Sequence, residues 1–78
     1  MTEAETLEWI DLILDSLDKH EMMAIIRESL NDFDGEFFET IGRETERYTV
    51  LNNQVTADRL TSIARTIAAL RQNRAENL

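Results

Sequence analysis

Hydrophobic residues recur along this chain at intervals of three and four positions. The two clearest series are Leu7, Ile10, Leu14 and Leu17, and then Leu60, Ile63, Ile67 and Leu70. Such spacing places each series on one face of an α-helix. No stretch shows the sustained alternation of apolar and polar residues that is typical of a strand. Because the chain has no proline and only two glycines to interrupt its helices, it is predicted to be all-α.

Three short segments combine a capping residue with an apolar pair suited to a hydrophobic staple, in which the residue before the cap packs on the residue five positions later. The caps and their pairs are Asp18 with Leu17 and Met22, Asp34 with Phe33 and Phe38, and Thr56 with Val55 and Leu60. Thr2, followed by Glu5, predicts a capping box at the first helix. Together these signals predict helices at about 3–16, 19–32, 35–50 and 56–74.

The segment 35–74 also allows a second interpretation. Four apolar residues on one face are compatible with one long helix: Phe37, Ile41, Tyr48 and Val55. Four poor helix formers favour a turn near 50–55 instead: Thr49, Val50, Asn52 and Asn53. We therefore predict a small bundle of about four short helices, built from two helical hairpins, as a single domain over residues 1–78. The alternative is three helices, the last running over 35–74.

The first two predicted helices have broader apolar faces than an ordinary surface helix. The apolar arc of the first spans roughly 160°, against about 100° for a surface helix, and Leu12 lies outside even that arc. A chain this short has a marginal core, so the surplus predicts a homodimer. The candidate interface residues are Trp9, Leu12, Ile13, Met22 and Met23. In the alternative interpretation, Trp9 and the two methionines fill the core of the bundle.

Acidic residues are concentrated in the first half of the chain. The sequence has 16 acidic and 8 basic residues, for a net charge of −8. Residues 1–39 hold 12 of the acids against Lys19 and Arg27, so their net charge is −10, and residues 40–78 have a net charge of +2. This balance argues against nucleic acids and anionic membranes as partners. Either the basic half neutralises the acidic half, within one chain or across a dimer, or the acidic surface binds a basic protein.

Composition also indicates a cellular compartment. The chain has no cysteine, and its longest apolar runs are three residues, far short of the roughly 20 that span a membrane. Its first residues are acidic, whereas a signal peptide begins with basic residues. We therefore expect a soluble, cytoplasmic protein.

The stretch LNDFDGEFFE, residues 30–39, resembles a calcium-binding loop in the order of Asp32, Asp34 and Gly35. With Gly35 at loop position 6, however, Leu30 and Ile41 occupy positions 1 and 12, where calcium needs oxygen ligands. His20 is the only histidine and has no glutamate three residues before it. Glycine-rich phosphate loops are absent as well. We therefore expect no metal, no cofactor, no small-molecule substrate and no enzymatic activity.

These observations favour a non-catalytic, acidic protein–protein interaction or adaptor module that associates with itself through its first two helices. The alternative is an acidic regulatory protein that masks a basic, nucleic-acid-binding surface of a target protein. The sequence leaves the partner and the biological process open.

Overall fold

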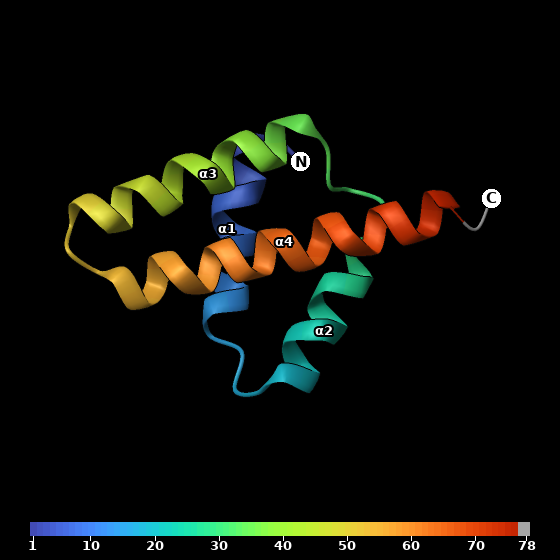
Figure 1. Ribbon diagram of the computed structural model, residues 1–78, viewed down its shortest axis with the longest axis horizontal. Coiled ribbons are helices and arrows are strands. Elements are labelled where there is room, and N and C mark those ends of the chain that lie inside the picture. The colour runs from blue at the N-terminus through green and yellow to red at the C-terminus, as the bar shows by residue number, and fades with distance from the viewer. Residues whose placement is uncertain (77–78) are drawn as a thin grey trace. The chain divides into compact units, whose positions relative to one another are not determined.

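Four α-helices make up the part of the chain that the structure describes (Figure 1). This computed structural model describes the backbone of residues 1–76 and the side chains of residues 1–72. The helices are α1 (Glu3–Leu14), α2 (Lys19–Glu28), α3 (Gly35–Val50) and α4 (Gln54–Glu76), and no strand occurs within residues 1–76. The predicted small helical bundle is therefore confirmed. Because the chain turns between α3 and α4, the alternative of one helix over residues 35–74 is wrong.

Contacts between residues divide the chain into two compact units. Unit 1 is Met1–Ile41 and unit 2 is Gly42–Leu78, so the boundary lies inside α3. The boundary also separates the charges, because unit 1 has a net charge of −10 and unit 2 a net charge of +2. That all 78 residues fold as a single domain stays a prediction.

The predicted caps of the first three helices are confirmed. Thr2 and Glu5 form the capping box of α1, in which the Glu5 amide donates to Thr2 Oγ1 at 3.2 Å and the Thr2 amide donates to Glu5 Oε1 at 3.0 Å. Asp18 caps α2 by accepting the Glu21 amide at 2.8 Å. Asp34 accepts the Phe37 amide at 2.9 Å in the first turn of α3. These bonds satisfy amide groups that the first turn of a helix leaves without a partner.

Both α1 and α2 end earlier than the apolar pattern predicts. After α1, the buried Ser16 hydroxyl donates to the Ile13 carbonyl at 2.6 Å, a local bond that competes with continuation of the helix. After α2, the Ser29 amide bonds the carbonyl three residues back, in the tighter pattern common at helix ends. Leu17, in the α1–α2 connection, is 89% exposed. Its predicted staple with Met22 is therefore wrong.

The turn between α3 and α4 is a Schellman motif closed by two asparagines. Asn52 adopts the left-handed conformation, with φ of 63°, and its amide donates to the Thr49 carbonyl at 3.0 Å. The amide of Asn53 donates to the Tyr48 carbonyl at 2.8 Å. Asparagine tolerates the left-handed region better than most residues, which explains how the chain reverses here without glycine.

The cap of α4 differs from the predicted one. Asn53 Oδ1 accepts the Thr56 amide at 3.3 Å, so Asn53, and not Thr56, caps the helix, which begins at Gln54. Val55 is 81% exposed, so the predicted staple of Val55 on Leu60 is also wrong. The Schellman motif explains the shift, because it brings Asn53 directly to the start of α4.

Aromatic side chains form the centre of the unit 1 core. Trp9 from α1 makes edge-on contacts with the rings of Phe33 and Phe37, with ring centroids 5.3 and 5.4 Å apart. The centroids of Phe33 and Phe37 are 4.5 Å apart. Four buried isoleucines of unit 1 complete the core: Ile10, Ile13, Ile26 and Ile41. Edge-on aromatic pairs add about 0.5–1.5 kcal/mol each beyond the burial of their area.

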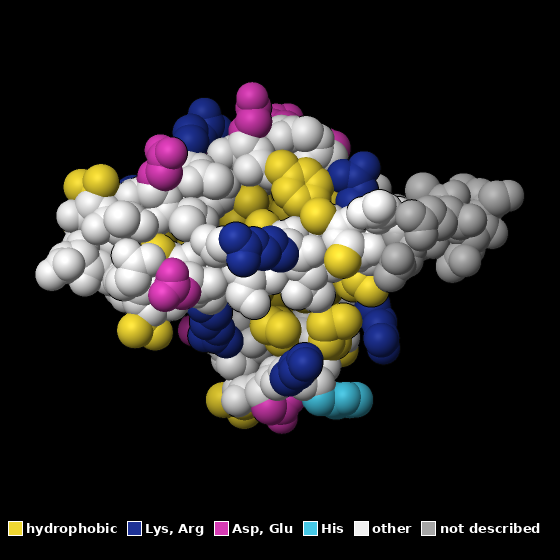
Figure 2. All heavy atoms as spheres, viewed as in Figure 1, with side chains coloured by type: hydrophobic (Ala, Val, Ile, Leu, Met, Phe, Trp, Pro, Cys, Tyr) yellow, Lys and Arg dark blue, Asp and Glu magenta, His cyan; other side chains and the backbone are white. Residues whose placement is uncertain are grey.

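Within its described side chains, unit 2 contains one buried apolar seam along α4. The buried residues are Ala57, Leu60, Ile63 and Ile67, which recur at three- and four-residue spacing, and Leu70 is half-buried. Other hydrophobic side chains protrude where α3 and α4 join, at the left of the view (Figure 2). The exposed residues of this turn are Val50, Leu51 and Val55.

Candidate functional site

An open pocket of about 460 Å³ lies in unit 1. Its lining residues are Met1, Glu5, Glu8, Trp9, Leu12 and Asp32. Glu5, Glu8 and Leu12 share one face of α1, because their successive spacings of three and four residues each correspond to about one helical turn. Asp32 comes from the connection between α2 and α3. The pocket therefore combines acidic side chains with apolar surface from Trp9 and Leu12.

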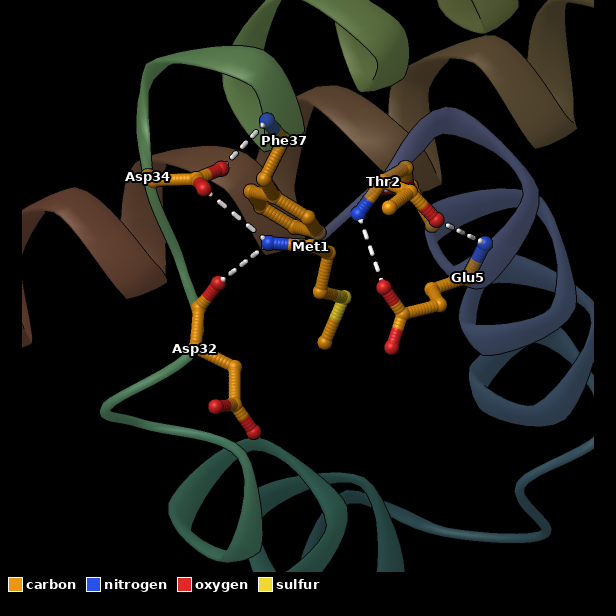
Figure 3. Close-up of polar contacts among 7 residues, drawn as sticks. Met1, Thr2, Glu5, Asp32, Asp34 and Phe37 are labelled. Atoms are coloured by element: carbon orange, nitrogen blue, oxygen red, sulfur yellow. Dashed lines mark hydrogen bonds and ion pairs between the residues drawn. The ribbon is translucent and has the colours of Figure 1, made fainter.

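The amino group of Met1 links the start of the chain to the α2–α3 connection (Figure 3). It donates to the backbone carbonyl of Asp32 at 2.9 Å and to Asp34 Oδ2 at 3.1 Å. Asp34 thereby has one oxygen on this ammonium and the other on the Phe37 amide. These bonds bring Asp32, which is distant from α1 in sequence, to the pocket formed on α1.

Two carboxylates near the pocket are held in the ionised form by local hydrogen bonds. The pKa of Asp34 is lowered, first by the hydrogen bond from the Phe37 amide and then by the bond from the Met1 ammonium. The pKa of Glu5 is lowered, first by the hydrogen bond from the Thr2 amide and then by the bond with the Thr2 side chain. Both carboxyl groups are exposed, and their hydrogen bonds stabilise the first turns of α1 and α3.

The other two carboxylates of the pocket are not engaged. Within the described residues, Glu8 makes no hydrogen bond or ion pair, and Asp32 contributes only backbone groups. The Asp32 side chain points away from the Met1 amine (Figure 3). No lysine, arginine or histidine side chain lines the pocket. Glu8 and Asp32 therefore give the pocket negative charge that no hydrogen bond or ion pair neutralises within the described residues.

Trp9 forms the apolar wall of the pocket. Its side chain is only 6% exposed and is held by the rings of Phe33 and Phe37. Its indole Nε1 is buried and, within the described residues, has no hydrogen-bond acceptor. A buried donor without an acceptor is costly and uncommon in folded proteins. The Trp9 side chain therefore includes one buried polar group that the described chain does not satisfy.

The predicted interface residues are divided between the core and the surface. Trp9 and Ile13 are buried in unit 1, so they are not available to a partner in this conformation. Leu12 is 56% exposed, while Met22 and Met23 are half-buried. Whether these three contact a second copy stays a prediction. The pocket itself was not predicted, although the spacing of Glu5, Glu8 and Leu12 indicates its α1 side.

The motif that resembles a calcium loop forms a helix start. Asp34 uses its two oxygens on the Phe37 amide and the Met1 ammonium, and the Asp32 carbonyl accepts the same ammonium. In the described part of the chain, no three acidic, histidine or cysteine side chains are grouped as metal ligands would be. His20, at the start of α2, is exposed. Among the described residues, no helix has the length and apolar character needed to cross a bilayer.

Comparison with protein-family models, curated proteins and solved structures finds no significant match to this chain.

Proposed function

We propose that this protein is a non-catalytic interaction module that binds a basic protein partner through unit 1. One observation carries the proposal: unit 1 has a net charge of −10, and its open pocket has two carboxylates, Glu8 and Asp32, with no cationic partner among the described residues. Such a surface attracts a basic protein over a distance of about 10 Å at 0.1 M salt. A regulator that masks the nucleic-acid-binding surface of its target is one protein of this kind.

The same charge disfavours other partners. The acidic surface of unit 1 would repel a nucleic acid or an anionic membrane. A protein that binds either one needs clustered lysine and arginine, which displace counterions from the nucleic acid or are attracted to the membrane surface. We propose that the module acts in the cytoplasm, since the chain has no cysteine to form the disulfides that are common in secreted proteins.

Affinity capture from cytoplasmic extract, followed by mass spectrometry, tests this proposal. The proteins captured at 50 mM salt should have basic surfaces, and the binding of each purified partner should weaken steeply between 50 and 500 mM salt. A matched variant of unit 1 with Glu3, Asp11, Asp15 and Glu28 replaced by their amides should bind more weakly, while retaining the helical circular dichroism signal. Affinity that does not change with salt would contradict the proposal.

Self-association is a second candidate, and the exposed Leu12 is the observation that favours it. Leu12, a predicted interface residue, is 56% exposed on the same helix that forms the pocket, so it is accessible to a second copy of the chain. Light scattering over a micromolar concentration range should then give twice the chain mass of 9.1 kDa, and Leu12→Ser should lower the measured mass. A mass of one chain at every concentration would exclude a stable homodimer.

A further inference from the structure

The pocket on α1 combines two features that together favour one class of ligand. Its carboxylates, Glu8 and Asp32, lie at an opening beside apolar surface from Leu12 and Trp9. A lysine or arginine side chain has the same two parts, because its alkyl stem packs on apolar surface and its charged head pairs with carboxylates. We propose that the pocket receives one basic side chain from a partner protein, a step that rests on the function proposed above.

Charge complementarity supports this occupant over the alternatives. Four of the six residues that line the pocket carry charge, three of them carboxylates, and the one cation, the Met1 ammonium, is already bound by Asp34 and by the Asp32 carbonyl. An anionic ligand would therefore meet repulsion. A neutral apolar ligand would leave Glu8 and Asp32 near apolar surface without a partner, which is unfavourable.

The roles of the pocket residues are distinct. Glu5 is occupied in the capping box, where its Oε1 accepts the Thr2 amide, so it mainly fixes the start of α1. Glu8 comes from α1 and Asp32 from the α2–α3 connection, and both line the pocket and contribute negative charge that no ion pair among the described residues neutralises. Leu12 is exposed and offers apolar surface for the alkyl stem. Trp9 also lines the pocket, but its side chain is 6% exposed and is held by Phe33 and Phe37, so it adds little area to that surface.

A fluorescence titration tests the proposal directly, because Trp9 is the only tryptophan of the chain. The probe is an acetylated and amidated nonapeptide with one arginine among glycine and serine, and its control has citrulline in place of arginine. A second probe has five lysines. The arginine peptide should change the Trp9 emission saturably at 50 mM salt, whereas the citrulline peptide should leave it unchanged.

Two matched double variants locate the site. Glu8→Gln with Asp32→Asn should weaken binding of the arginine peptide about fivefold, since each exposed ion pair contributes a factor of about two or more. Asp11→Asn with Asp15→Asn removes the same charge from α1 and its C-cap, outside the pocket lining, and should change affinity less than twofold. Circular dichroism of all variants verifies that the helices are retained.

The outcomes separate this inference from the proposed function. Equal losses in the two double variants would overturn the pocket while leaving a general attraction of unit 1 for basic partners. Binding of the five-lysine peptide without any response to the arginine peptide would likewise overturn the pocket while leaving a general attraction of unit 1 for basic partners. If neither peptide bound the wild-type chain, both the pocket and the proposed function would be contradicted.

Discussion

Phe37 is the residue on which the unit 1 core depends most. Its side chain is fully buried and its ring contacts Trp9, Phe33 and Phe38, at centroid distances of 5.4, 4.5 and 5.3 Å. Replacing a buried phenylalanine by alanine costs about 3–5 kcal/mol in the free energy of unfolding. A chain of 78 residues has about 4–12 kcal/mol in total at typical stability per residue. Phe37→Ala should therefore remove a quarter or more of the total stability.

Urea denaturation, followed by Trp9 fluorescence and by circular dichroism, measures this effect. Ile41→Val is the matched control, because Ile41 is also buried, lies one turn further along α3 and loses only one methylene, at about 0.5–1.5 kcal/mol. Phe38→Ala should cost less than Phe37→Ala, since Phe38 is half-buried. A loss for Phe37→Ala no larger than that for Ile41→Val would refute the view that the aromatic cluster holds unit 1 together.

Three further predictions concern the caps and the turn. Folding lowers the pKa of Asp34 and Glu5, so their stabilisation is complete above the ordinary carboxylate range of about 4 and is lost as the pH falls below it, through the lowered pKa values of the folded chain. The gap in urea midpoint between the wild type and Asp34→Asn should therefore be clear at pH 7 and narrow steadily as the pH falls below about 4. Because φ is 63° at Asn52, Asn52→Gly should raise the free energy of unfolding by up to about 1 kcal/mol, and Asn52→Ala should lower it by about 1 kcal/mol. Equal urea midpoints for the two variants would argue against the left-handed turn. Asn53→Ala should lower the free energy of unfolding by about 1 kcal/mol, which corresponds to a fall of about 4–8 °C in the midpoint of thermal unfolding. Thr56→Ala should change that free energy little. A larger loss for Thr56→Ala than for Asn53→Ala would show that Thr56 is the cap.

Local hydrogen bonds explain which parts of the fold could be predicted from the sequence. The caps at Thr2, Asp18 and Asp34 depend on residues within three positions of one another, so the sequence shows both partners. The hydrophobic staples at Leu17 and Val55 were wrong because they require the side chain to be covered, and both side chains are exposed. Burial depends on where the rest of the chain lies, which spacing along one helix does not determine.

The candidate site was harder to predict for the same reason. The α1 side of the pocket follows the helical spacing of Glu5, Glu8 and Leu12 and was open to prediction. Asp32 reaches the pocket through the bond between its carbonyl and the Met1 amine, a contact across 31 positions. Trp9 had two interpretations, as interface or as core, and its position against Phe33 and Phe37 required the structure.

The boundary between the two units has a consequence for how the chain folds. It divides the 16 residues of α3 after Ile41, so each unit contains about half of that helix. Isolated helices shorter than about 12–15 residues are marginal in water, because the first turn is costly to form. Without tertiary packing neither half of α3 would persist alone, so helix–coil cooperativity along α3 links the ordering of the two units. We expect the two units to melt together, and a chain cut after Ile41 to lose α3 rather than to yield two independent pieces.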